Sequence, residues 1–104
     1  MIHTLYATFE TLEEARQVAG TLVAEKLIAC ANILPGATSV YRWEAQVQED
    51  GEVILFAKTC EARVAAAVER LAALHSYDVP CVTAWPVAAG HPPYLAWVRD
   101  EVSQ

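Results

Sequence analysis

The sequence predicts an α+β fold whose elements follow the order β-α-β-β-α-β and end with one more helix. Two observations lead to this order. Apolar, β-prone stretches recur along the chain, and between them lie two segments whose apolar residues repeat at helical spacing. A chain of 104 residues without internal repeats or low-complexity segments suits one domain, which we expect to cover residues 1–104.

The first strand and helix have clear signals. Ile2 to Phe9 is apolar and β-prone apart from threonines and one histidine, which is typical of a central strand. Thr11 then offers a hydroxyl as N-cap, and Glu14 three residues later completes the pattern of a capping box. We expect a helix of about four turns that ends near Lys26, where a cation suits the helix dipole. Its apolar positions are Leu12, Ala15, Val18, Ala19, Leu22 and Val23.

The second strand is expected within Leu27 to Glu44. Its first half is apolar enough to be buried on both faces, and Pro35-Gly36 then predicts a bulge or bend, because proline cannot donate a ladder hydrogen bond. In its second half, successive residues are expected to lie on opposite faces of the strand. One face is predicted to carry Tyr41, Trp43, Ala45 and Val47, and the other Arg42 and Glu44.

The third strand is expected to include Val53 to Ala57, an unbroken apolar run that predicts cover on both faces. Local turn chemistry places the preceding hairpin turn at Asp50-Gly51.

A second helix, a fourth strand and a last helix complete the chain. Thr59 precedes the second helix, which is expected to end at His75, and its apolar stripe is Val64, Ala67, Val68, Leu71 and Leu74. Ser76 to Pro80 reads as a loop and Cys81 to Val87 as a strand, with Pro86 placed near a sheet edge or bulge. The prolines after Gly90 predict the start of a helix with Leu95, Val98 and Val102 along one face.

This order is the split β-α-β plan of ferredoxin-like folds, built on an antiparallel sheet. Hydrophobic residues make up 55% of the chain. For so short a chain we interpret the surplus as an oligomer interface, and a high alanine content is the alternative explanation.

Charge and cysteine content exclude several classes of protein. The net charge is −6 and no cluster of lysine or arginine occurs, so we expect neither nucleic acid nor an anionic membrane as a partner. No apolar run is long enough to span a membrane, and Met1 to Thr4 lacks the features of a signal peptide, which predicts a cytoplasmic location. Cys30, Cys60 and Cys81 are odd in number and lack C-x-x-C spacing, so we expect reduced thiols.

Enzyme motifs are missing from the sequence. It contains no phosphate-cradling glycine loop, no Gly-x-Ser-x-Gly and no His-Glu-x-x-His, and no nucleophile has an evident adjacent base. We therefore expect no enzyme.

His75 is the leading candidate for a metal ligand. An imidazole at the end of a helix, beside Ser76-Tyr77-Asp78, could bind a borderline divalent metal such as copper(II). The alternative is that it caps the last carbonyls of the helix. Cys30 is a weaker candidate, because a cysteine in a buried strand is usually a small apolar side chain.

Several ordered motifs resemble the CutA family of divalent-cation tolerance proteins over nearly the whole chain. They are Leu27 to Glu44, Glu49-Asp50, Lys58-Thr59, Leu74 to Pro80, Trp85-Pro86-Val87 and Tyr94 to Trp97. The resemblance implies the ferredoxin-like plan, a homotrimer assembled through sheet edges, and a role in copper or other divalent-cation tolerance. It also implies a hairpin turn near Glu44 to Gln46, the register that we adopt over Asp50-Gly51.

The resemblance bears on the metal question. The family motif has a histidine where this chain has His75, and its Ala-Cys-x-Asn motif matches Cys30. Members credited with copper binding add a histidine and a first-strand cysteine, whose positions here hold Leu74 and Ala7. Two of three such ligands are therefore absent.

A group of aromatic and charged residues is expected to line a small-molecule cleft or the trimer interface, since both kinds of site favour such side chains. These residues are Tyr41, Arg42, Trp43, Glu44, Lys58, Tyr77, Tyr94 and Trp97. The alternative function is a signalling module like the trimeric PII proteins, which holds a small molecule in clefts between subunits.

Overall fold

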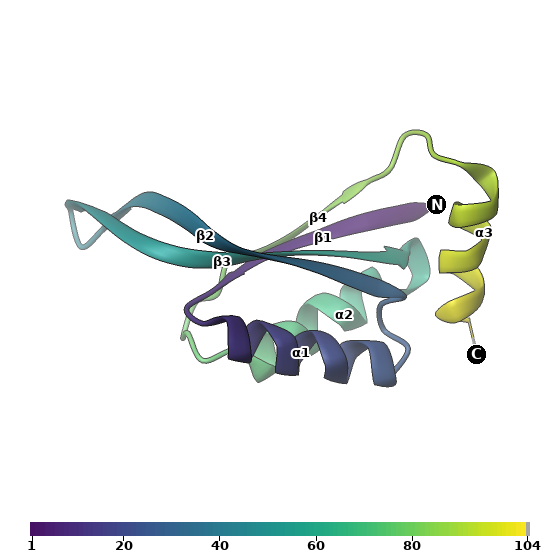
Figure 1. The fold of residues 1–104 in the computed structure, drawn as a ribbon, viewed down its shortest axis with the longest axis horizontal. Helices are drawn as coiled ribbons and strands as arrows, with labels where there is room; N and C mark the ends of the chain where they lie inside the picture. The colour runs from purple at the N-terminus through teal and green to yellow at the C-terminus, as the bar shows by residue number, and fades with distance from the viewer. Residues whose placement is uncertain (104) are drawn as a thin grey trace.

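The computed structural model describes residues 1–103 and confirms the predicted α+β plan (Figure 1). Four strands form one antiparallel sheet in the order β2-β3-β1-β4. The elements are β1 (Ile2–Phe9), α1 (Leu12–Ala24), β2 (Cys30–Trp43), β3 (Gln46–Cys60), α2 (Glu61–Leu74), β4 (Val82–Pro86) and α3 (Pro92–Glu101).

β1 is an inner strand, as its apolar sequence predicted. It pairs with β3 from Ile2 opposite Cys60 to Phe9 opposite Val53, and with β4 on its other side. β4 is an edge strand, and Pro86 is its last residue. The missing N–H of Pro86 therefore costs the sheet little, which confirms the expected position of this proline.

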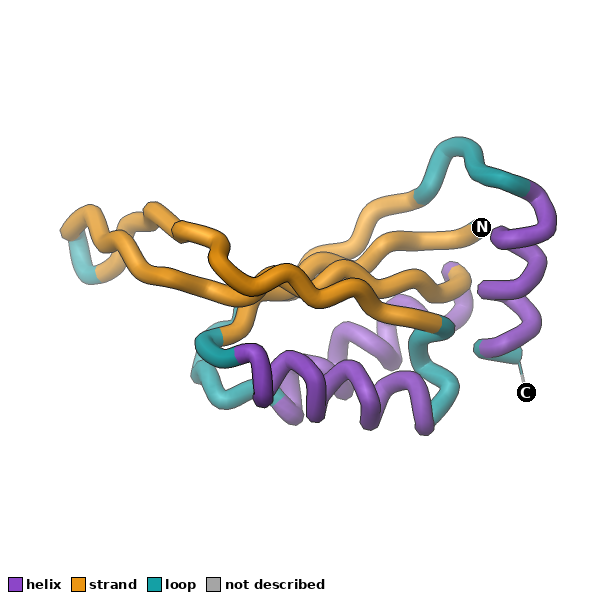
Figure 2. Tube along the Cα trace, viewed as in Figure 1, coloured by secondary structure: helices purple, strands orange, loops and turns teal. Residues whose placement is uncertain are grey.

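Helices α1 and α2 cover one face of the sheet, and neither covers the other face (Figures 1 and 2). Leu5, Ala7 and Leu55 point toward these helices and are fully buried. Ile54 and Phe56, on the opposite face, are only partly buried. The prediction that β3 is covered on both faces is thus wrong for the single chain, because the strand alternates between a helix-covered and an open face.

The first helix begins as predicted, but the Glu14 side chain does not make the predicted capping-box contact. The Glu14 N–H donates to Thr11 Oγ1 at 3.1 Å, which is an N-cap hydrogen bond. The Glu14 carboxylate does not return to the Thr11 N–H, as a capping box requires, and instead accepts hydrogen bonds from Ser76. Only half of the capping box forms, because the carboxylate holds a distant loop.

The hairpin turn lies at Glu44 and Ala45, in the register that the family resemblance implied. Both residues have positive φ, 50° and 65°. A two-residue hairpin turn needs such angles for its twist to match that of the flanking strands. Asp50 and Gly51 lie inside β3, opposite Ser39 and Thr38, so the turn indicated by local chemistry is wrong.

β2 is bent where Pro35-Gly36 predicted a bulge. Its register with β3 shifts between Leu34 and Ala37, and Gly36 has a φ of 90°. The predicted alternation fails beyond Trp43, because the turn reverses the chain and places Val47 opposite Arg42. Residues that are directly opposite share a face, so Val47 does not lie with Tyr41 and Trp43.

The outer halves of β2 and β3 form a hairpin arm, residues 37–52, that extends past the end of β1 and past the helices (Figure 2). The arm lengthens the molecule to 44 Å along its longest axis. It carries four exposed large apolar residues: Val40, Tyr41, Trp43 and Val47. A two-stranded ribbon of this kind has little stability on its own, so a covering surface would stabilise it.

Helix α3 closes the opposite end of the sheet (Figure 1). Val98 and Val102 pack there with Ile2 and Ala29 in a second small core. Arg63 Nε donates to the Val102 carbonyl at 2.8 Å and ties α3 to α2. Within residues 1–103 no helix has the length and apolar character needed to cross a membrane.

Candidate functional site

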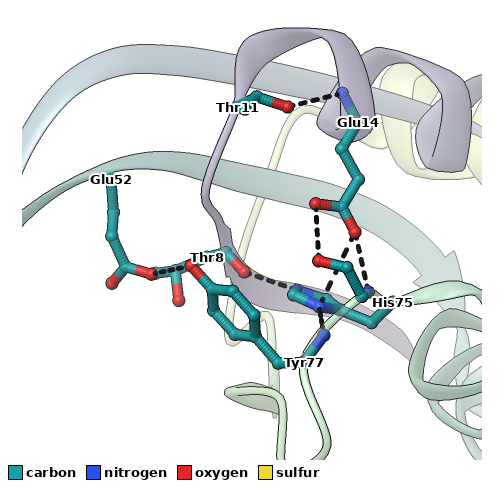
Figure 3. Close-up of polar contacts among 7 residues, drawn as sticks. Thr8, Thr11, Glu14, Glu52, His75 and Tyr77 are labelled. Atoms are coloured by element: carbon teal, nitrogen blue, oxygen red, sulfur yellow. Dashed lines mark hydrogen bonds and ion pairs between the residues drawn. The ribbon is translucent and has the colours of Figure 1, made fainter.

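The His75 ring lies buried just after α2 and is held by backbone groups on both sides (Figure 3). Its Nδ1 atom is 3.1 Å from the N–H of Tyr77, and its Nε2 atom is 2.7 Å from the carbonyl oxygen of Thr8. An amide N–H can only donate, so Nδ1 is the acceptor and Nε2 carries the proton that Thr8 accepts. The ring also stacks on Phe9, with ring centroids 4.4 Å apart.

These contacts define a structural role for His75. Both ring nitrogens are engaged, so neither presents a free lone pair to a metal ion. The ring does not cap its own helix either, because its Nε2–H donates to the carbonyl oxygen of Thr8, near the end of β1. His75 instead joins the loop after α2 to the end of β1.

Glu14 holds the same loop from the side of α1. Its carboxylate accepts the Ser76 N–H at 2.8 Å and the Ser76 hydroxyl at 3.0 Å, and it lies 3.9 Å from Nδ1 of His75 (Figure 3). Three elements, β1, α1 and α2, therefore fix the position of residues 75–77.

Tyr77 extends from this fixed loop toward β3. Its ring lies 4.7 Å from that of His75, and its hydroxyl donates to Glu52 Oε2 at 3.0 Å (Figure 3). Burial raises the pKa of Tyr77 above its ordinary value, and the hydrogen bond to Glu52 and the charges of Glu52, Glu10 and Glu14 raise it further. The hydroxyl therefore stays protonated and remains a donor throughout the physiological range.

Tyr77 forms one wall of a cleft of about 790 Å³. We call it the arm cleft, because it lies between the hairpin arm, the end of β1 and the loop before β4. Its lining residues are Tyr6, Thr8, Glu10, Ser39, Val40, Tyr41, Trp43, Asp50, Gly51, Glu52, Tyr77, Asp78, Val79 and Cys81. Since Thr8 pairs with Ile54 and Glu52 is two residues away, the cleft opens on the helix-free face of the sheet.

The arm cleft combines aromatic rings with acidic groups. Four of its lining residues carry a carboxylate. Among residues 1–103, no Lys, Arg or His lines the cleft. Tyr41 donates a hydrogen bond to Asp50, which raises the pKa of the tyrosine. The volume of the cleft lies within the range of small-molecule sites.

The structure divides the predicted site residues into two groups. Tyr41, Trp43 and Tyr77 line the arm cleft, whereas Arg42 and Glu44 lie at the arm tip without lining it. Lys58, Tyr94 and Trp97 lie at the other end of the sheet. Within one chain the eight residues therefore do not form a single site.

Cys30 belongs to the second group. Its Sγ atom lies 3.3 Å from the Tyr94 hydroxyl, and it pairs with Lys58, which is opposite Thr4. His75 binds Thr8, four residues further along β1, which corresponds to about 13 Å of strand. Cys30 and His75 therefore cannot coordinate one metal ion in this fold.

The described residues contain no group of three or more His, Cys, Asp or Glu side chains placed to hold a metal ion. None of the three cysteines forms a disulfide in the structure.

Sequence reasoning missed the acidic lining of the arm cleft. Asp50 was considered as part of a turn and of a family motif, and Asp78 as a neighbour of His75, but none of Glu10, Asp50, Glu52 and Asp78 was assigned to a cleft. The available signal was the spacing of Asp50 and Glu52, which places both on one face of β3 once the turn is at Glu44.

Tyr94, in α3, makes the stability of the folded protein depend on pH. Burial, followed by the hydrogen bond with Cys30, raises the pKa of Tyr94 from 10.0 to about 12. The pKa of Tyr94 is higher in the folded than in the unfolded chain. The contribution of Tyr94 to the free energy of unfolding is therefore complete below pH 10 and disappears as the pH rises through about 12. We expect the absorbance titration of the native protein, minus that of Tyr94→Phe, to show one phenol ionising near pH 12. A difference curve centred near pH 10 would contradict this assignment.

Comparison with known families gives one clear match. The family model described as CutA1 divalent ion tolerance protein matches residues 3–101. A divalent-cation tolerance protein CutA of Thermus thermophilus is 44% identical over 100 residues, which cover 96% of this chain and 97% of that protein. A chloroplastic CutA 1 protein of Oryza sativa is 42% identical, but the aligned region covers only 56% of its length.

Solved structures agree with these matches. The Thermus thermophilus protein superposes with a TM-score of 0.94 at 44% identity, covering 97% of this chain and 98% of the other. A CutA described as periplasmic, from Archaeoglobus fulgidus, superposes with a TM-score of 0.95 at 34% identity, covering 99% and 100%. The family and its Thermus thermophilus member are named for divalent-cation tolerance and not for an enzymatic activity. The matches include chloroplastic and periplasmic proteins, so the cytoplasmic location stays a prediction.

Proposed function

Since the chain belongs to the CutA1 divalent ion tolerance family, we propose that it takes part in tolerance of divalent cations as a homotrimer that binds copper(II) or a similar ion weakly. The observation that carries the proposal is the extent of the family match, which runs from β1 to the end of α3. The naming of the family for divalent-cation tolerance supports this role, and we propose no enzymatic activity.

Two features support self-association. The face of the sheet opposite α1 and α2 carries partly buried apolar side chains, among them Ile54 and Phe56. The hairpin arm exposes Trp43 and Val47, with 56% and 74% of their surface accessible. Apolar area on the open sheet face and on the hairpin arm favours burial against further copies of the chain. The trimeric state is the one that the family resemblance implies.

Weak metal binding follows from the arrangement of the donors. His75 has both nitrogens engaged, and Cys30 shares a hydrogen bond with Tyr94. A tight copper site needs several nitrogen or sulfur donors around one ion. We therefore propose that copper(II) binds at exposed donors, of which the imidazole of His91 is one.

Calorimetric titration with copper(II) against a weak competing chelator tests this proposal. We expect weak binding that His75→Ala leaves unchanged at equal folded concentration and that His91→Ala, the matched loss of an exposed imidazole, weakens. Loss of one site per chain in folded His75→Ala would make His75 a ligand and contradict the proposal. No binding to the wild type would remove direct chelation from the function.

The arm cleft favours a second candidate function, that of a signalling module like the PII proteins. Its volume and its aromatic and polar lining suit a small molecule. It opens on the face that we propose for self-association, so in a trimer it would lie near a boundary between subunits. We propose that a small molecule bound there reports a metabolic state through the assembly.

A further inference from the structure

We propose that His75 is a pH-sensitive switch: when its ring gains a second proton, Tyr77 leaves the position in which it is bound to the hairpin arm. The inference does not depend on the proposed tolerance function. It rests on contacts within one chain, where the side chain of His75 is already 0% exposed. Association with further copies therefore cannot cover the ring any further.

The neutral ring makes two hydrogen bonds of opposite direction. Its Nε2–H donates to the Thr8 carbonyl at 2.7 Å, and its Nδ1 atom accepts the Tyr77 N–H at 3.1 Å (Figure 3). A protonated imidazole is a donor at both nitrogens. The bond to Thr8 therefore survives protonation, whereas the bond to Tyr77 is replaced by two N–H groups that point at each other. Because two donors cannot share this contact, the Tyr77 N–H has to move away.

Glu14 offers an acceptor for the new proton. Its Oε2 atom lies 3.9 Å from Nδ1 of His75, so a movement of about 1 Å brings the two atoms within hydrogen-bond distance. The same oxygen accepts the Ser76 N–H at 2.8 Å. A protonated ring therefore competes with Ser76 for this carboxylate, and the backbone just before Tyr77 loses part of its support.

The groups around the ring can accommodate a positive charge. On β1, the Phe9 ring is stacked on His75 with centroids 4.4 Å apart, and an aromatic face attracts a cation. On α1, Glu14 is the charged group among the contacts of His75 within residues 1–103. The carboxylates of Glu10 and Glu52 act on the neighbouring Tyr77. Burial deprives a charged ring of its hydration, and these neighbours offset part of that loss.

Tyr77 connects the switch to the hairpin arm. Its hydroxyl donates to Glu52 Oε2 at 3.0 Å, and Glu52 is the last residue of the arm (Figure 3). A displacement of the Tyr77 backbone moves this hydroxyl relative to Glu52. Carboxylates and phenols ordinarily titrate outside the range from about pH 5.5 to about pH 8, whereas histidine titrates within it. In this range the charge of the His75 ring is therefore the variable that acts on the arm.

Nuclear magnetic resonance of the isotopically labelled full chain, in the presence of a metal chelator, tests the switch. Spectra are recorded from about pH 8 to about pH 5.5, at a concentration where light scattering gives one assembled mass throughout. We expect the nitrogen shifts of His75 to show a proton on Nε2 alone at high pH and on both nitrogens at low pH. The amide signals of Tyr77 and Glu52 are expected to shift with the same midpoint.

Three variants separate the steps. His75→Gln keeps a polar side chain that does not titrate, and it is expected to abolish the pH response of the Tyr77 amide. His91→Gln is the matched control, because it makes the same replacement at an exposed histidine, and it is expected to keep the response. Tyr77→Phe keeps the backbone N–H and removes the hydroxyl. The amide at position 77 is then expected to respond to pH while that of Glu52 does not.

Four results would overturn the switch. They are a ring that still carries one proton at about pH 5.5, a ring that gains its second proton without a shift of the Tyr77 amide, different midpoints for ring and amide, and a Tyr77 response that persists in folded His75→Gln. The first three need only the wild-type protein, so they decide the question even if His75→Gln does not fold. A Glu52 response that persists in Tyr77→Phe would overturn the connection to the arm.

Discussion

Replacement of His75 by alanine is expected to lower the free energy of unfolding by about 3 kcal/mol. The change removes a buried ring that stacks on Phe9, and it leaves the Thr8 carbonyl and the Tyr77 N–H without their partners. Urea denaturation at a fixed protein concentration measures the loss, because the stability of an oligomer depends on concentration.

His91→Ala serves as the control for this experiment. His91 is exposed and makes no side-chain cap for α3, so its replacement is expected to change the free energy of unfolding by less than about 0.5 kcal/mol. Similar values for the two variants would show that the contacts of His75 contribute little, and would contradict its assignment as the link between the loop and β1.

Phe56→Asp is expected to abolish self-association. Phe56 lies near the middle of the open sheet face, where its ring centroid is 5.5 Å from that of Tyr6. A carboxylate buried there between subunits would lose its hydration, and such burial costs several kcal/mol. Light scattering during size-exclusion chromatography is expected to give three times the chain mass for the wild type and the mass of one chain for the variant.

Ala73→Asp adds the same charge to the exposed outer side of α2 and is expected to leave the assembled mass unchanged. A wild-type mass of one chain would contradict the proposed homotrimer. A Phe56→Asp variant that keeps the wild-type mass would move the interface away from the open sheet face.

Elements with strong local signals could be predicted from the sequence. Thr11 marks the start of α1 because its hydroxyl can satisfy the N–H of Glu14 without any distant contact. The bulge at Pro35-Gly36 follows equally from the backbone chemistry of those two residues. The turn at Glu44 and Ala45 could not be predicted in this way, because pairing along the whole of β3 decides the register and overrides the local preference of Asp50-Gly51.

The candidate site depends on tertiary contacts that leave no local pattern. His75 was singled out as a candidate metal ligand or helix cap, but the acceptor of its ring N–H is the Thr8 carbonyl, 67 residues away in sequence. The bond between Tyr77 and Glu52 spans 25 residues, and the arm cleft exists only after both ends are in place. Residue type and spacing could therefore indicate that this loop is special, but they could not assign its partners.

The hairpin arm gives the chain two parts with different sources of order. The body of the sheet is stabilised by its own helices, whereas residues 37–52 have a single strand partner and no helix beneath them. Local opening of the arm therefore requires much less free energy than opening of the body in a separated chain. For the proposed homotrimer we expect that dilution lowers the protection of the arm amides against hydrogen exchange and leaves that of the body unchanged. The arm would then be the element through which protein concentration acts on structure.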